Sequence, residues 1–450
     1  MSLHKGKKIF KNTILVLAWI ICAVPAILII TLKTPTTQKF LIQIFENWWQ
    51  NNLNAKLEIG AIKIATFTNI ELIDVKLYDQ LDSTLIAVSS LKAKIKNIAP
   101  FSKPFKMEFK DAIIRDPYVN LRIYKGDTTL NMNFIFEFFA NEKEKSTPHI
   151  FINNSKISNG IVKYVDENTH PSDSTFNYDA IEFFDLNLWI SDFQLMDDND
   201  ISVKIHNLSA KEKYGFQIKH LDGDFTMTSK HFALNNAHIL TPQTYLNTDL
   251  LFRYKSFESF QYFVDSVEMN MTFRPSNLSF IDISFFAPEL KGIIIPIRLY
   301  GSVNGYVNDL HSDKLKLVLG KGSIIDLQFA MKNVTYPNIL EYSLALNGRN
   351  ISNEDISAIN IKGKSVLPTE IHLPEISILT LNAKGQGLAE KIDLQFSLEN
   401  PNEDLFISIN GNNNIYIGQR DLIILIFLKL IFLIILYSTL MDNWHLILLI

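Results

Sequence analysis

The sequence predicts a mostly β protein built on a long, curled antiparallel sheet, with a transmembrane helix and a short amphipathic helix before it. Three observations lead to this fold class. Apolar and polar residues alternate from residue 57 to about residue 417, with turn-forming residues between the alternating runs. Thr13–Leu32 carries no charge, and apolar residues recur at helical spacing within Thr36–Gln50.

The length and composition exclude several classes of protein. A chain of 450 residues is too long for one compact core, since cores stop growing at about 250–300 residues. No linker-like stretch divides it, which favours an elongated body that grows by adding strands. The net charge of −4 argues against a nucleic-acid binder. The single cysteine, Cys22, lies in an apolar run and excludes structural disulfides and cysteine-based zinc sites.

The first segments are predicted to be a basic stretch, residues 1–12, and a membrane anchor, residues 13–32. Four lysines lie before the uncharged segment, which places the N-terminus in the cytoplasm and the bulk of the chain across the membrane. A cleaved signal peptide is the alternative. Its apolar region would span about 7–15 residues, whereas this one continues through Ile27–Ile30 beyond the small residues. We therefore expect an uncleaved, single-pass anchor.

Residues 33–56 are predicted to contain the amphipathic helix. Its apolar stripe consists of Phe40, Leu41, Ile44, Phe45 and Trp48. Such a helix lies on a membrane surface, with its tryptophan at the interface, or it plugs the end of a β-structure. One helix can do both, and the sequence does not choose between these roles.

The C-terminal segment, residues 419–450, departs from the strand pattern. It is almost wholly apolar, and Leu422–Leu440 has the length of a second membrane helix. Lys429 near its centre makes insertion unfavourable by at least about 2.5–3.5 kcal/mol. The alternative is a truncated or out-of-frame end, because Asn412–Asn414 implies adenine-rich coding DNA in which a one-base slip is plausible.

Residues 57–418 form the predicted β region. Their spacing predicts antiparallel hairpins in series, about 25 strands spanning about 120 Å at about 4.8 Å per strand. A sheet of that size twists or curls. Nine residues on alternating apolar faces are the candidate functional residues: Ile73, Val75, Leu77, Leu315, Leu317, Leu319, Leu394, Phe396 and Leu398.

The apolar faces need a cover, and few helices are predicted to supply one. Phe134–Phe139 and Phe257–Val264 are the best short helical candidates. An uncovered apolar face must meet a second sheet, a partner or a lipid. The pattern alone therefore leaves two possibilities, a β-sandwich that closes its own core and a curled sheet that forms an elongated hydrophobic groove.

Several stretches resemble one known family. Leu57–Lys96 is similar to the N-terminal motif of AsmA-like proteins and of TamB, a component of the translocation and assembly module. The matching residues are the pair Ile59-Gly60, followed by Ile70, Leu72, Val75, Leu77 and Asp79. Further similar stretches are Asn131 with Phe134, Ile157–Asp166, Tyr214 through Thr241, Pro275–Leu290 with its Asp282, and Tyr300–Gly305.

The resemblance implies a groove in the periplasm, anchored in the inner membrane and engaged in moving phospholipids toward the outer membrane. The nine apolar residues would then be candidates for its lining. The alternative is an assembly factor that templates outer-membrane β-proteins by strand pairing with a barrel partner. The large C-terminal domain that contacts the outer-membrane partner in TamB-like proteins is not found in this sequence.

No catalytic, cofactor-binding or metal-binding motif stands out. The ten histidines are scattered without an HExxH pattern. Gly320-Lys321-Gly322-Ser323 is similar to a phosphate loop, but Leu315 occupies the position of the first glycine, so a turn is predicted there. We therefore expect neither an enzyme nor a cofactor.

Overall fold

The computed structural model describes residues 34–66, 68–99, 102, 106–140, 149–169, 177, 179–196, 200–285, 292–361, 364–365, 377–386, 391–400 and 405–412. The chain divides into two compact units, Met1–Asn168 and Thr169–Ile450, which are described separately. The predicted anchor, residues 13–32, and the apolar tail, residues 419–450, lie outside the described residues. Among the helices that the described residues form, none is long and apolar enough to cross a membrane.

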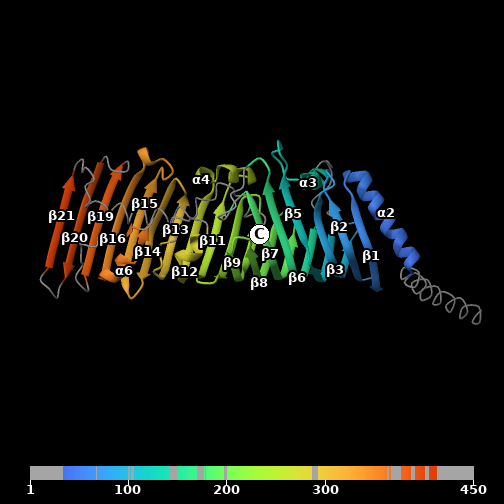
Figure 1. Ribbon diagram of the computed structural model, residues 1–450, viewed down its shortest axis with the longest axis horizontal. Helices are drawn as coiled ribbons and strands as arrows, with labels where there is room; N and C mark the ends of the chain where they lie inside the picture. Colours follow the sequence, from blue (N-terminus) through green and yellow to red (C-terminus); the bar gives the residue numbers. More distant parts are fainter. Residues whose placement is uncertain are drawn as a thin grey trace, which may run out of the picture. The chain divides into compact units, whose positions relative to one another are not determined.

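The first unit is a sheet with two helices (Figure 1). Its elements are α2 Pro35–Leu53, β1 Leu57–Thr66, β2 Asn69–Tyr78, β3 Thr84–Ala99, β4 Lys106–Arg115, β5 Tyr118–Ile123, α3 Asn133–Ala140 and β6 His149–Asp166. Strands β1, β2 and β3 pair antiparallel in chain order. Strand β3 then pairs antiparallel with β4 and, beyond a break at Asp116-Pro117, with β5.

Strand β6 differs from the predicted succession of antiparallel hairpins. It pairs parallel with both β4 and β5. A parallel neighbour needs a crossover connection, and the segment that contains α3 provides it. The apolar residues of Phe134–Phe139 therefore lie in a helix, as predicted, but that helix belongs to a crossover.

Helix α2 confirms the predicted amphipathic helix. Thr34 caps it with its side chain, Pro35 occupies the first turn, and Asn54 ends it in the left-handed conformation. The helix buries Ile42 and Leu53, and Glu46 Oε1 accepts a hydrogen bond of 2.8 Å from the backbone N–H of Ile59 in β1. Four of the five stripe residues are exposed: Phe40, Ile44, Phe45 and Trp48. The predicted stripe is thus mostly a solvent-facing surface.

A row of interruptions crosses the first sheet. Between β1 and β2, Gly60 and Asp74 lie opposite each other but are not paired. Between β2 and β3, the same holds for Asp74 and Ser89. Asp74, Asp116 and Asn159 all have positive φ, a conformation that Asp and Asn tolerate better than most side chains. Ser89 Oγ donates to Asp116 Oδ2 at 2.6 Å, and Asn159 Nδ2 donates to Asp116 Oδ1 at 2.7 Å. These unpaired positions therefore mark local kinks in the strands.

The second unit is an antiparallel sheet in which each strand pairs with the next (Figure 1). Its strands are β7 Ala180–Leu195, β8 Ile201–Glu212, β9 Gln217–Met227, β10 His231–Leu240, β11 Tyr245–Arg253, β12 Glu268–Leu278, β13 Ile297–Tyr306, β14 Asp309–Leu319, β15 Ser323–Lys332, β16 Glu341–Ile351, β19 Ser377–Gln386, β20 Lys391–Asn400 and β21 Leu405–Asn412. The strand β17 Asn360–Ile361 pairs with β18 Lys364–Ser365 in a separate small sheet.

Short helical segments connect some of these strands. They are η2 Phe257–Tyr262, α4 Phe263–Ser266, α5 Phe280–Ile283, η4 Pro337–Ile339 and α6 Asn353–Ser357. The predicted helical stretch Phe257–Val264 is thus confirmed as η2 followed by α4. The mostly β fold is confirmed as well.

A bulge between β13 and β14 keeps the apolar side chains on one face. The register shifts between Gly301 and Asn304, and the adjacent residues Asp313 and Lys314 are both exposed. Burial therefore resumes at Leu315 on the face that already held Leu310. Gly301 has φ +133, and a Cβ at this position would overlap the carbonyl oxygen of Lys314, so the bulge requires glycine.

Candidate functional site

Apolar residues align in rows across the second sheet. In one row Leu315 pairs with Leu327, Leu327 with Leu346, and Leu346 with Leu381. The register continues to position 396 in β20 and position 409 in β21. Because residues paired across antiparallel strands project to the same face, each row is continuous across its strands. We call this row and its two neighbours the apolar rows.

The two neighbouring rows have the same character. One runs through Leu299, Leu317, Ile325, Gly348 and Leu379, and reaches position 398. The other runs through Ser312, Phe329, Leu344 and Ala383, and reaches position 394. Strand β20 is the fourth strand after β14 in the order of pairing. The predicted site positions 315 and 396 therefore lie in one row, and positions 317 and 398 lie in another.

The structure brings some of the nine predicted residues together and separates others. Leu315, Leu317 and Leu319 lie on β14 with 4%, 3% and 0% of their surface exposed. Positions 394, 396 and 398 lie on β20, but the side chains of Leu394, Phe396 and Leu398 fall outside the described residues. In the first unit, Leu77 is buried, whereas Ile73 and Val75 on the same strand are half-buried.

Connecting segments contribute to the core formed on this face. Leu317 and Leu327 belong to a cluster that also contains Phe280 and Ile283 of α5 and Ile356 of α6. These residues lie in connections between strands, where no alternation marks them in the sequence. The cluster explains why the β14 residues are buried although they lie on a single sheet.

Buried aspartates fix turns that connect neighbouring strands. Asp355 in α6 is 3% exposed and accepts hydrogen bonds from Lys321 N at 2.9 Å, Ser323 N at 3.1 Å and Ser323 Oγ at 2.7 Å. Burial raises the pKa of Asp355, but these hydrogen bonds outweigh it and hold the pKa below the ordinary value. The predicted turn at Gly320–Ser323 is confirmed, and its backbone donors bind the chain's own carboxylate.

Two other aspartates also fix turns, and both lie in stretches on which the predicted resemblance rests. Asp282 in α5 is buried and accepts a hydrogen bond of 3.1 Å from Gln243 N in the turn before β11. Asp79 accepts from Leu81 N and Ser83 N at 3.0 and 2.9 Å, and from Asn131 Nδ2 at 2.9 Å. The roles of these three carboxylates in this structure are structural.

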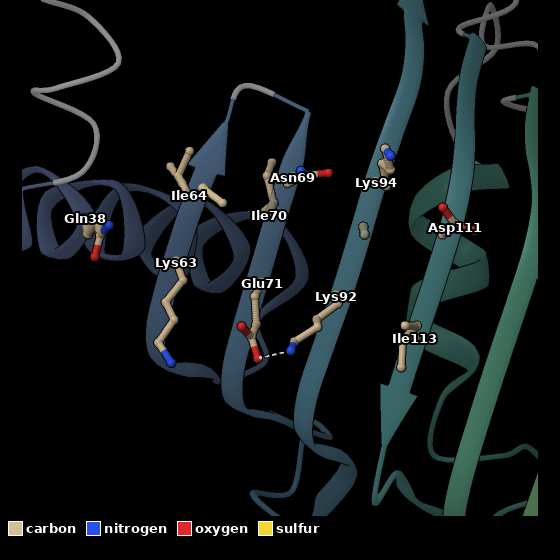
Figure 2. Close-up of a pocket in the computed structure, with 12 residues that line it drawn as sticks. Gln38, Lys63, Ile64, Asn69, Ile70, Glu71, Lys92, Lys94, Asp111 and Ile113 are labelled. Carbon is tan, nitrogen blue, oxygen red and sulfur yellow. Dashed lines mark ion pairs between the residues drawn. The ribbon is translucent and has the colours of Figure 1, made fainter.

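A second candidate site is a concavity of about 620 Å³ in the first unit, shown in Figure 2. Its lining comes from the first residues of α2 and from strands β1 to β4: Gln38, Lys63, Ile64, Ala65, Asn69, Ile70, Glu71, Lys92, Ala93, Lys94, Asp111 and Ile113. Lys92 Nζ lies 3.5 Å from Glu71 Oε1, which also accepts a hydrogen bond of 2.9 Å from Ser90 Oγ. Partial burial raises the pKa of Glu71, but Ser90, Lys92 and the nearby charge of Lys63 together outweigh it and lower the pKa.

The sequence reasoning missed this concavity. The sequence contains one sign of this site: Lys92 and Lys94 are two positions apart and therefore share one face of their strand. The neighbouring strands place Glu71 and Lys63 next to them. Cross-strand pairing of Glu71 with Lys92 and of Lys94 with Asp111 brings these charges together. Only the register of four strands reveals that grouping.

A histidine pair on the second sheet shares one carboxylate. Asp222 Oδ1 lies 3.0 Å from His220 Nε2, and Asp222 Oδ2 lies 3.1 Å from His238 Nδ1. Within the residues that the structure describes, no group of three or more His, Cys, Asp or Glu side chains is arranged to hold a metal ion.

Comparison with known proteins gave no match, since no family model, curated protein or solved structure is similar to this chain. The resemblance to AsmA-like and TamB-like proteins therefore stays a prediction from the sequence motifs.

Proposed function

We propose that this chain is an inner-membrane-anchored periplasmic protein that carries phospholipid toward the outer membrane, with the acyl chains sliding along the apolar rows. The observation that carries the proposal is the continuity of those rows from β14 through β19, with Leu315, Leu327, Leu346 and Leu381 in register. The predicted anchor and the resemblance noted in the sequence support the proposed location.

The energetics favour such a carrier over free diffusion. A phospholipid has about 30 methylene groups, and each gains about 0.8 kcal/mol on leaving water for an apolar surface. Exposing two acyl chains to water therefore costs about 25 kcal/mol. A continuous apolar face offsets most of this cost, and equal rows make neighbouring positions nearly equal in free energy.

Occupancy of the rows requires that the connecting segments yield space to a lipid. The residues of β15 that face the rows, such as Phe329, are almost completely buried, whereas their neighbours Gln328 and Ala330 are exposed. Lipid must therefore replace part of the contact that α5 and α6 make with the core. The face that α5 and α6 cover in this structure can carry phospholipid once these segments are displaced.

The test is photo-cross-linking of the full chain in cells labelled with radioactive phosphate. The probe p-benzoylphenylalanine replaces Phe329, an aromatic residue of the apolar rows, and in a matched control it replaces Gln328 on the opposite face. We expect a labelled phospholipid adduct at position 329 and little or none at position 328. Equal labelling at both positions, or no labelling at 329, contradicts the proposal.

A second function, templating of outer-membrane β-proteins, is favoured by one observation. Among the described residues, β21 pairs with β20 alone, and templating requires such a strand to pair with another chain along its second edge. Cross-linking from an exposed position of β21 distinguishes the two functions. Adducts with nascent barrel proteins support templating, and an absence of such adducts leaves lipid carriage as the function.

A further inference from the structure

We propose that the concavity lined by β1 to β4 binds the phosphodiester headgroup of a phospholipid. This inference rests on the proposed function and names the part of the lipid that the first unit recognises. Three observations carry it: the charge of the lining, the apolar residues between the charges, and the position of the concavity next to the start of α2.

The charges in the lining suit a single negative charge. Lys63, Lys92 and Lys94 contribute three positive charges, and Glu71 and Asp111 contribute two negative ones, which leaves a formal charge of +1. Within the described part of the chain, Lys92 is paired with Glu71, whereas no ion pair involves Lys63 or Lys94, and both are exposed. A phosphodiester carries one negative charge, and lysine ammonium groups bind phosphate as point charges.

Apolar residues lie between the charges. Ile64, Ile70 and Ile113 line the same concavity, and Ile113 is 36% exposed. Figure 2 shows Ile113 and Lys92 on neighbouring strands, with the Glu71–Lys92 ion pair beside them. A site for free phosphate would need only the charges, whereas a lipid also brings glycerol and acyl carbons that fit these apolar walls.

The concavity also lies close to the predicted membrane surface. Gln38 is part of its lining and lies only six positions after Leu32, the last residue of the predicted anchor. Six residues span at most about 20 Å, which keeps the concavity near the headgroup layer. The exposed Phe40, Ile44 and Trp48 of α2 have the amphipathic character of residues at a membrane interface.

The experiment again uses the full chain in cells labelled with radioactive phosphate. The photo-cross-linker p-benzoylphenylalanine replaces Ile113, which is exposed and lines the concavity. We expect an adduct with the mass of a diacyl phospholipid. The double variant Lys63→Glu/Lys94→Glu should reduce that adduct about tenfold, because each lysine near a lipid headgroup strengthens binding several-fold.

The matched control is Lys76→Glu/Lys110→Glu. Both lysines are exposed on β2 and β4, and neither lines the concavity. This variant has the same change in net charge, and we expect its adduct to equal that of the unmodified chain. Equal resistance of both double variants to protease shows that neither has unfolded.

Three outcomes overturn the inference: no adduct at position 113, an adduct that the Lys63→Glu/Lys94→Glu variant leaves unchanged, or an adduct with the mass of a soluble glycerophosphodiester. The probe at position 329 separates this failure from failure of the proposed function. A lipid adduct at 329 without one at 113 refutes the headgroup site alone, whereas the reverse refutes carriage along the apolar rows.

Discussion

Strands β2 and β15 both have ten residues, and both alternate apolar with polar side chains, yet they end in different environments. In β15 every second residue from Ser323 to Met331 is buried. In β2 only Leu77 is buried, and most other residues are half-exposed. The alternation is a property of the strand, but burial depends on what lies over the strand.

The cause of the difference is visible in the connections. Above β13 to β16, the segments around α5 and α6 place Phe280, Ile283 and Ile356 in the shared core. The corresponding part of the first sheet carries lysines and a concavity. The strands of the second unit thus have a covered apolar face, and those of the first unit have a partly open face with mixed charge. The following predictions test this contrast, from the largest effect to the smallest.

Leu327→Ala and Leu72→Ala compare the same truncation on β15 and β2. Leu327 is 2% exposed, so its replacement leaves a cavity and lowers the free energy of unfolding by about 3 kcal/mol. Leu72 is half-buried, and its truncation should cost about 1 kcal/mol. Pulse proteolysis in urea, with fragments assigned to each unit by mass spectrometry, measures both effects. Equal losses would remove the contrast between the two sheets.

Gly301→Ala and Gly60→Ala compare the interruptions of the two sheets. At Gly301 the new Cβ would overlap the Lys314 carbonyl at φ +133, so we expect a loss of about 2 kcal/mol. At Gly60 the nearest atom to a Cβ is Asp74 Cβ at 3.0 Å, and φ is not positive. The cost there should stay below about 1 kcal/mol. The same proteolysis assay applies, and a larger loss at Gly60 would contradict the interpretation of these kinks.

Asp355→Asn should lower the free energy of unfolding by about 2 kcal/mol at neutral pH, because the turn loses a charged acceptor. The hydrogen bonds outweigh burial and depress the pKa of Asp355 in the folded chain. The stabilisation is therefore fully present above about pH 4, the ordinary range, and is lost as the pH falls through the folded-state pKa. The gap between the two chains should shrink in acid.

Glu354→Gln is the matched control for Asp355. Glu354 pairs with Lys321 at 2.6 Å, but both side chains are about 70% exposed, and such pairs contribute little. We expect no measurable change in the urea midpoint at any pH. A large loss of stability in Glu354→Gln with none in Asp355→Asn would contradict the assignment of Asp355 as the stabilising carboxylate of this turn.

Glu212→Gln should give a small change in stability, with the opposite sign to that of Asp355→Asn. Burial raises the pKa of Glu212, which is 1% exposed. The carboxyl therefore contributes stability below its unfolded pKa and loses it as the pH rises through the folded value. The amide variant should be more stable than the natural chain at pH 8, by less than about 1 kcal/mol, and similar to it near pH 4. Melting temperatures across this range provide the measurement.

The sequence predicts the elements of this protein better than their partners. Period-two alternation predicts the strands, and the spacing from Phe40 to Trp48 predicts α2, because both patterns are local. The parallel pairing of β6 escapes such reasoning, since it depends on which strand edge is free. The role of Asp355 escapes it too, because its partners Lys321 and Ser323 are more than thirty residues away.

For the candidate site too, local features were predictable from the sequence and long-range contacts were not. The sequence places Leu315, Leu317 and Leu319 on one face, and the structure agrees, since all three are buried together. Their burial was not predictable, because the residues of α5 and α6 that join them have no periodic signal. The charged concavity was not predicted either, because its lining is assembled from four strands and one helix.

Because the apolar rows stay in register from strand to strand, a pair of neighbouring strands can be removed or added without breaking the rows. Leu315 faces Leu327 on β15, and Leu346 on β16 faces Leu381 on β19. Removing β15 and β16 together would leave β14 and β19 antiparallel, with Leu315 facing Leu381. Loss or duplication of one hairpin would shorten or lengthen the sheet by about 10 Å and leave each row intact. Evolution can therefore adjust the length of this sheet by whole hairpins without redesigning its face.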